Sequence, residues 1–269
     1  MAKITMKQKR ESKLYLKSVI LKGNGKLKDF DNPETGEKFR YMQFSTQAIK
    51  DCPFASDGCK AICYATKGNH QFPSVKLSRE RAKADSLKDD FAECVIYTVE
   101  TESESGKYKG THILFRLHES GDFYSLAYLK KWIKVFAHFL QDSDVLITFV
   151  FYSKSFPLFL LLSEDEKRIF NACLEKGIVS MQVSLDDTTT AEQLISAAKL
   201  VKEFPLVNSY RCSESVEGVA DDDICDCADC AKCSKCNHAD GRNTVVKIHS
   251  ASEDDMKTYR KKSRKSKVA

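Results

Sequence analysis

The sequence predicts an α/β protein built as a partial (β/α)6 barrel, with a cysteine-rich metal-binding insertion near the C-terminus and charged flexible ends. Six short β-rich runs alternate with longer amphipathic stretches, a pattern that favours parallel strands joined by helices. Polar or cysteine residues follow directly after each run. Barrels place their chemistry on the loops after all their strands, whereas doubly wound sheets concentrate it at one switch point. The length of 269 residues is one that a single α/β barrel commonly reaches.

The expected strands are short runs rich in β-branched and aromatic residues. They lie at 41–46, 112–117, 145–152, 179–185, 206–211 and 245–249. The third run is apolar nearly throughout, as expected of a strand that is buried on both faces.

The expected helices are stretches in which apolar residues recur every three or four positions. They lie at 74–101, 124–141, 163–176 and 190–203. The third has the clearest boundaries, because Ser163 and Glu166 form a capping-box pattern at its start and Gly177 follows its end.

Charge divides the chain into three parts. Residues 1–28 carry a net charge of +8 and residues 257–269 one of +7, which leaves −10 for the middle of a chain whose total is +5. We therefore expect a basic N-terminal segment at 1–28, a single domain at 29–256 that includes the insertion at 212–238, and a basic disordered tail at 257–269. Only the two ends would offer weak nucleic-acid contact, since the core lacks a basic excess.

Hydropathy excludes membrane insertion. No apolar run is long enough to span a bilayer, and the basic N-terminus has no apolar segment behind it that would make a secretory signal. We expect a cytoplasmic protein with no membrane contact.

Cysteine usage indicates metal binding. The chain has 11 cysteines, and reduced cytosolic thiols do not form structural disulfides. Cys52, Cys59 and Cys63 fall in one loop, where Gly58 is expected to supply a positive φ. Three thiolates suit an iron–sulfur cluster with one open iron, because structural zinc takes four ligands. Zinc completed by His70 is the alternative.

A second group of five cysteines lies near the C-terminus, with a Cys-x2-Cys rhythm that ferredoxin clusters and zinc sites share. Its members are Cys225, Cys227, Cys230, Cys233 and Cys236. Cys212 and His238 are possible additional ligands, and the group could hold either a second [4Fe–4S] cluster or zinc.

Three motifs carry a resemblance to a known family. The stretch CPFASDGCKAICYA at 52–65, RLHESGDF at 116–123 and FYSKS at 151–155 are similar to those of the phage-encoded gene product 88 family. That family in turn resembles radical S-adenosylmethionine enzymes, and the similarity covers roughly residues 40–236.

The resemblance implies a cofactor site. Cys52, Cys59 and Cys63 would ligate a [4Fe–4S] cluster whose fourth iron binds S-adenosylmethionine, with Tyr64 packed beside that cofactor. The segment Ser120, Gly121 and Asp122 would bind the methionyl ammonium. Alternatively, Ser120 or Asp122 only caps the following helix. The cysteine spacing of six and then three residues departs from the three and then two that is usual in radical S-adenosylmethionine enzymes.

The expected function is that of an iron–sulfur enzyme of the radical S-adenosylmethionine type, acting on an unknown substrate with a reductant protein as partner. Candidate catalytic residues follow the predicted strands: His118, Lys154, Asp186 and Arg211. For each of them, a salt bridge or helix cap is an equally good reading. The rival function is a phage protein stabilised by zinc or iron–sulfur that binds nucleic acid without catalysis. A phage-encoded protein would act in the bacterial host cytosol.

Overall fold

The computed structural model describes residues 4–22, 28–32, 35–104, 106–141, 144–213, 243–247 and 252–266, with side chains omitted at 243–247 and 264–266. The five cysteines between Cys225 and Cys236, together with most of the predicted insertion, lie outside the described residues. The strands are β1 Phe30–Asp31, β2 Lys38–Phe44, β3 His112–Leu117, β4 Ile147–Ser153, β5 Val179–Asp186, β6 Asn208–Ser213 and β7 Asn243–Lys247. The helices are α1 Met6–Glu11, α2 Asp57–Ala61, α3 Pro73–Leu87, α4 Phe91–Ser103, α5 Leu126–Gln141, α6 Phe156–Leu160, α7 Glu164–Glu175, α8 Ala191–Glu203 and α10 Glu253–Ser266, with short 3₁₀ turns at Tyr64–Thr66, Gly68–Gln71 and Gly106–Tyr108.

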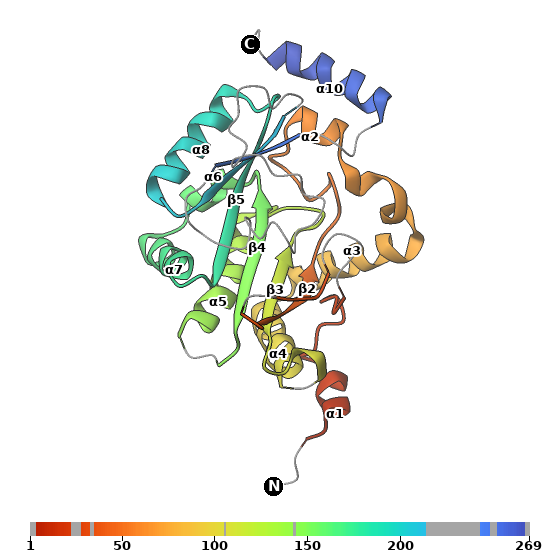
Figure 1. Ribbon diagram of the computed structural model, residues 1–269, viewed down its shortest axis with the longest axis vertical. Helices are drawn as coiled ribbons and strands as arrows, with labels where there is room; N and C mark the ends of the chain where they lie inside the picture. Colours follow the sequence, from red (N-terminus) through yellow and green to blue (C-terminus); the bar gives the residue numbers. More distant parts are fainter. Residues whose placement is uncertain are drawn as a thin grey trace.

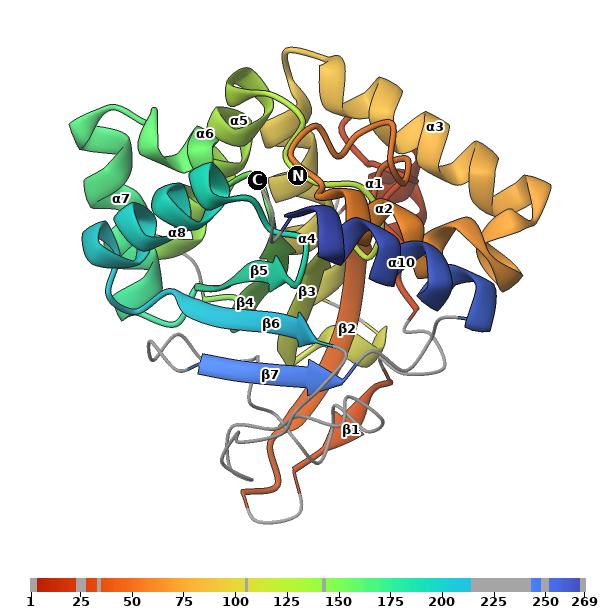
Figure 2. The same cartoon turned by 90° about the horizontal axis from the view of Figure 1, so that it is seen from above.

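One mixed sheet organises the fold. Its described strands follow the order β1-β2-β3-β4-β5-β6-β7, and every neighbouring pair from β2 to β7 is parallel, whereas β1 pairs antiparallel with β2. The six parallel strands curl into a half-barrel, and helices α4, α5, α7 and α8 pack along one side of it (Figures 1 and 2). All six predicted strands are present, each within three residues of its expected start.

Alternation along the strands gives the sheet two different faces. Phe115 and Phe149 point toward the helices and are fully buried in the main core, together with Trp132 of α5. Leu114 and Val150, one position away, belong to a small separate cluster on the concave face. The strand at 145–152 is therefore buried on both faces, as its apolar sequence predicted.

The helix expected over 74–101 is two helices. The chain leaves α3 at Lys88, whose ψ of 146° is extended, and α4 begins at Phe91, which is completely buried. Lys131 of α5 donates to the carbonyls of Ser86 and Lys88 at 3.1 and 2.6 Å and so satisfies acceptors that the break exposes. No proline or glycine marks this break, so the periodicity of the apolar residues predicts one uninterrupted helix.

The described part of the N-terminal segment is folded against the domain, in contrast to the flexible end that was expected. Thr5 and Gln8 form a capping box at the start of α1. Arg10 makes a double hydrogen bond to Glu102 of α4 at 2.7 and 2.6 Å, and Tyr15 donates to the same carboxylate at 2.7 Å. Because Glu102 is only 1% exposed, its charge requires these partners and fixes the segment.

The tail expected to be disordered over 257–269 instead belongs to helix α10 as far as Ser266. Tyr259 anchors the helix: its side chain is fully buried, and its hydroxyl accepts a hydrogen bond from the backbone N–H of Asp187 at 3.0 Å. Ion pairs join Lys262 to Asp57 and Lys67 to Asp255. Composition predicted disorder because the helix is highly charged, but the buried Tyr259 side chain and the two ion pairs dock it.

Candidate metal and cofactor site

The polar residues that follow the parallel strands meet at one end of the half-barrel. The cysteine loop follows β2, the segment Ser120–Asp122 follows β3, Lys154 follows β4, Asp186 ends β5 and Cys212 lies near the end of β6. Parallel strands have their carboxyl ends at the same edge, so residues far apart in the chain become neighbours. The sequence predicted this convergence, and the hydrogen bonds of the loop confirm it.

Helix α2 shapes the cysteine loop. Ser56 caps the helix by accepting a hydrogen bond from the N–H of Cys59 at 3.2 Å. Cys52 lies in a turn before this helix, and Cys63 lies between it and the next 3₁₀ turn. Gly58 does not adopt the expected positive φ, because it lies inside the helix. Its hydrogen side chain serves instead to let Thr188 and Tyr259 approach.

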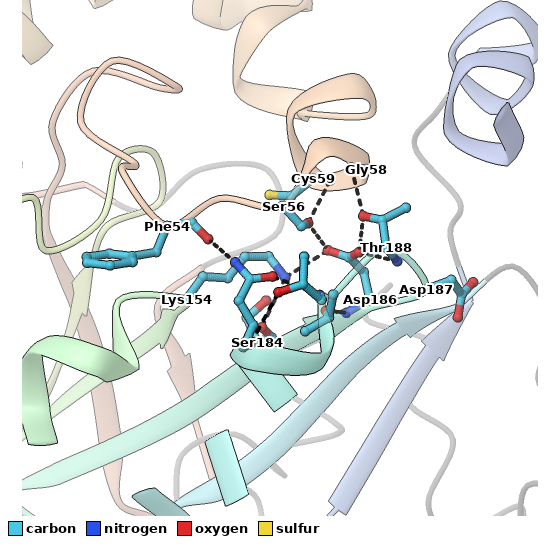
Figure 3. Close-up of polar contacts among 12 residues, drawn as sticks. Phe54, Ser56, Gly58, Cys59, Lys154, Ser184, Asp186, Asp187 and Thr188 are labelled. Carbon is cyan, nitrogen blue, oxygen red and sulfur yellow. Dashed lines mark hydrogen bonds and ion pairs between the residues drawn. The ribbon is translucent and has the colours of Figure 1, made fainter. Parts of the chain in front are cut away.

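A buried network fastens this loop to the end of β5 (Figure 3). The Asp186 carboxylate accepts hydrogen bonds from the Ser56 hydroxyl, and from the N–H and hydroxyl of Thr188 at 2.7 and 2.5 Å. The Thr188 hydroxyl in turn accepts from the N–H of Gly58 at 2.8 Å. The Lys154 ammonium lies 2.8 Å from Asp186 and donates to the Ser184 carbonyl at 3.0 Å.

The charges in this network stabilise one another. Burial acts against ionisation of both groups, yet the Lys154 ammonium and the hydroxyl donors hold the pKa of Asp186 below its ordinary value. Burial opposes a charged Lys154 in the same way, and attraction to Asp186 raises its pKa. Asp186 and Lys154 therefore form an ion pair whose carboxylate also receives hydrogen bonds from the cysteine loop.

The thiols of the loop lie within electrostatic range of each other. Burial raises the pKa of Cys59 to about 12, and the charges of Lys154, Asp186, Cys63 and Cys212 also act on it. Burial likewise raises the pKa values of Cys52 and Cys63. The thiols are therefore protonated at neutral pH, and a metal would have to displace their protons.

Of the possible ligands, thiols are what an iron–sulfur cluster or zinc requires, and Lys154 lowers the cost of a thiolate at Cys59. In the part of the chain that the structure describes, no three His, Cys, Asp or Glu side chains already stand in a metal-binding arrangement. The three cysteines are therefore donors of a suitable kind, but their side chains are not arranged as a metal site in this structure.

The segment after β3 is packed tightly on the loop after β2. Gly121 has a φ of 82°, and a Cβ atom there would lie 3.1 Å from the backbone carbonyl carbon of Thr46 and against its side chain. Ser120 donates its hydroxyl to the Thr46 carbonyl at 2.7 Å. Only glycine meets both requirements at position 121. Gly121 therefore allows the segment after β3 to pack closely on Thr46.

Asp122 is buried beside the cysteine loop. Its carboxylate accepts hydrogen bonds from the Ser153 hydroxyl at 2.7 Å and from the N–H groups of Lys154 and Phe123 at 2.8 and 2.7 Å, so both oxygens bind protein donors. Burial raises its pKa, while these donors oppose the rise. Its own N–H donates to the Asp51 carbonyl at 2.9 Å, and its charge acts on the Cys52 thiol. Helix α5, which follows this segment, is capped by Ser125 and not by Ser120 or Asp122.

Other expected site residues lie apart from the thiols. His118 is buried against Phe123, and its ring lies 3.0 Å from the Tyr128 hydroxyl. Burial and the charge of Arg116 lower the pKa of His118 to about 3, so its imidazole is neutral. The side chain of His118 thus belongs to the aromatic core on the helix side of the sheet.

Arg211 and Tyr64 also have defined partners. Arg211 is exposed and pairs with Asp187 at 3.1 Å. Tyr64, the residue after Cys63, donates its hydroxyl to the backbone carbonyl of Glu119 and packs edge-on against His70. Tyr64 therefore bridges the cysteine loop to the segment after β3.

Sequence reasoning missed three residues that shape the site: Ser56, Thr188 and Tyr259. Ser56 carries a recognisable signal, because serine followed by an acidic residue is typical of a helix start. Thr188 and Tyr259 carry no such sequence signal, because their contacts with Gly58 join positions that are far apart in the chain.

These features define a class: a mixed α/β protein with a curled parallel sheet and a cysteine loop at the carboxyl ends of its strands. Comparison with known families gives the particular one. Residues 18–239 match the gene product 88 family, and because this is most of the chain, the protein belongs to that family. The phage family expected from the three motifs is therefore confirmed. Searches among curated proteins and among solved structures found no match. Across the described residues, no helix is long and apolar enough to cross a membrane.

Proposed function

We propose that this chain is an iron–sulfur enzyme of the radical S-adenosylmethionine type, with the half-barrel as a partial (β/α)6 barrel. The observation that carries the proposal is the position of the cysteine loop. It follows the first parallel strand, at the end of the sheet where Ser120–Asp122, Lys154 and Asp186 converge. Cys52, Cys59 and Cys63 would hold a [4Fe–4S] cluster, and the segment Ser120, Gly121 and Asp122 would face bound S-adenosylmethionine.

When bound, the cluster would supply an electron that cleaves the sulfonium of the cofactor, and the resulting radical would abstract hydrogen from a substrate. The chain's own residues orient the cysteine loop and balance the charges around it. Lys154 offsets the negative charge of a Cys59 thiolate, and Asp186 holds the loop through Ser56. The charge of Asp122 reaches Cys52 and would also attract the methionyl ammonium. Lys154 and Asp186 are thus positioning residues.

This arrangement gives His118 and Arg211 no part in the chemistry. Tyr64 would flank the cofactor from the end of the loop, where its hydroxyl is held by the Glu119 carbonyl. An external reductant would deliver the electron.

The test is metal content. Anaerobically reconstituted full-length protein should be brown, and Cys59→Ala should lose about four irons and four sulfides per chain, the content of one [4Fe–4S] cluster. Cys173→Ala is the matched control, because Cys173 belongs to α7 and its side chain is buried in the core. Addition of S-adenosylmethionine should change the spectrum of the reduced cluster. Colourless protein with stoichiometric zinc would contradict the proposal.

One observation favours the rival function, a metal-stabilised nucleic-acid-binding protein. Lys257, Arg260 and Lys261 are exposed along α10, where they could contact phosphates. The double variant Lys257→Gln/Lys261→Gln keeps the Tyr259 anchor and removes two charges. If nucleic-acid binding is the function, this variant should weaken binding of duplex DNA and lower its salt dependence. If the enzyme reading holds, iron content and the spectral response should stay unchanged.

A further inference from the structure

His112, the first residue of β3, joins separate segments at the amino ends of the parallel strands. Its Nδ1 atom lies 2.9 Å from the carboxylate of Glu37, in the connection between β1 and β2, and its Nε2 atom lies 2.9 Å from the hydroxyl of Thr148 in β4. The Thr148 hydroxyl also lies 2.8 Å from the carbonyl oxygen of Gly177, shortly before β5. The imidazole therefore ties the hairpin at one edge of the sheet to its middle strands.

All three contacts are satisfied together only when both ring nitrogens carry a hydrogen. A carbonyl cannot donate, so the Thr148 hydrogen points to Gly177 and the Thr148 oxygen accepts from the Nε2–H of His112. An ionised Glu37 carboxylate is also an acceptor, so Nδ1–H donates to it. A neutral ring has a single N–H and leaves one of these hydrogen bonds unmade. It also loses the attraction between opposite charges that strengthens the bond to Glu37.

The hairpin that His112 contacts covers a small apolar cluster. Phe39 of β2 stacks on the His112 ring with 5.0 Å between centroids, and Phe30 of β1 stacks on Phe39 at 4.7 Å. Both phenylalanines pack on the concave-face cluster that includes Leu114 and Val150. Because β1 pairs with β2 over only two residues, side-chain contacts such as that of His112 with Glu37 contribute to holding the hairpin in place.

Among the described residues, Glu37 is the charged side chain that contacts the His112 ring. The elements packed around the ring also carry exposed charged residues, namely Lys38, Lys109, Asp144 and Lys176, and two ion pairs, Arg40–Asp31 and Lys107–Asp29, each at 2.7 Å. These groups face solvent or one another. The hydrogen bonding of the ring therefore depends on Glu37 and Thr148.

We propose that His112 is a pH-sensitive latch, which holds the β1–β2 hairpin on the apolar cluster while its ring is doubly protonated and loosens the hairpin when the ring loses a proton. Histidine is the side chain that ordinarily changes its charge near neutral pH. The latch lies at the amino ends of the strands, whereas the cysteine loop follows the carboxyl end of β2. It therefore does not depend on the proposed iron–sulfur function.

The experiment measures amide hydrogen exchange in the hairpin of the full chain from about pH 5 to about pH 8, while nitrogen-15 spectra follow the His112 ring. The reporters are the N–H groups of Asn32 and Gly36, which donate to the carbonyls of Glu37 and Asn32 at 2.8 and 2.9 Å. Protection factors remove the intrinsic effect of pH on exchange. We expect them to fall about fivefold in wild type as the ring loses a proton, the change that loss of one ordinary hydrogen bond produces.

Three variants separate the latch from a general effect of pH. Glu37→Gln keeps a hydrogen-bond acceptor but removes the charge, so its hairpin should have the lower protection at every pH. His112→Gln cannot change its charge and should also lose the pH dependence. His138→Gln is the matched control, because His138 of α5 contacts a glutamate too, Glu100 at 2.7 Å, but lies outside the hairpin. It should behave as wild type.

The outcomes decide the role of His112. Protection that falls with rising pH in wild type and in His138→Gln, but not in Glu37→Gln or His112→Gln, supports the latch. Constant protection in wild type while the His112 ring loses its proton would refute it, and so would an equal fall in wild type and His112→Gln. If His112→Gln does not fold, Glu37→Gln gives the same comparison from a partly exposed position. Refutation here leaves the proposed function standing, because none of these measurements involves the cysteine loop.

Discussion

Replacing Gly58 by alanine tests how the cysteine loop is held. Helix propensity alone predicts that alanine stabilises an exposed helical position by about 1 kcal/mol relative to glycine. In this fold, however, a Cβ at position 58 would lie 2.5 Å from the Thr188 hydroxyl oxygen and 2.6 Å from the Tyr259 ring. Both distances are shorter than any real Cβ contact, so Thr188 and Tyr259 would have to move.

The cost follows from the contacts that must shift. Overpacking of this kind costs about 1–3 kcal/mol. Displacement of Thr188 also weakens its hydrogen bond to the Gly58 N–H, worth about 0.5–1.5 kcal/mol. These losses exceed the gain in propensity, so we expect Gly58→Ala to lower the free energy of unfolding by about 1–3 kcal/mol.

The assay is urea unfolding of Gly58→Ala beside Lys60→Ala, an exposed position in the same helix that should change stability by less than about 0.5 kcal/mol. In a Tyr259→Ala background the alanine at position 58 should cost less, because one of the two clashing groups is gone. If Gly58→Ala is as stable as wild type or more so, then Thr188 and Tyr259 do not pack on the loop as described.

Two further predictions concern buried charge. Lys154→Met leaves Asp186 charged and buried, and it should destabilise the protein by about 3–5 kcal/mol in chemical denaturation. The double variant Lys154→Met/Asp186→Leu should recover part of this loss. Equal stability of Lys154→Met and wild type would refute the ion pair. The pKa of His118 is about 3 in the folded protein and has its ordinary value in the unfolded chain. As the pH falls, this imidazole is therefore protonated in the unfolded chain before it is protonated in the folded protein. Stability should therefore fall as pH drops below about 6.5, by at most about 1.4 kcal/mol per pH unit from this group, and His118→Gln should remove that part of the slope while His138→Gln retains it.

The local pattern of the sequence determined the six parallel strands, several of the helices and the end of the sheet at which the polar residues gather. Strand runs and caps such as Ser163 with Glu166 are properties of adjacent residues, so they could be read without a structure. Parallel order then places the residues that follow the strands at one edge, and so the neighbourhood of Cys59, Lys154 and Asp186 was predictable in outline.

Only the tertiary structure decided how that edge is assembled. The docking of α10 depends on Tyr259 meeting Gly58 and Asp187, contacts between distant segments that composition does not encode. His118 followed a predicted strand just as Lys154 did, but its side chain turns into the aromatic core instead. A sequence pattern specifies which residues reach the edge of a sheet. Which of them face the loop depends on packing between elements, because distant segments decide which side chains are buried against aromatic groups and which meet polar partners.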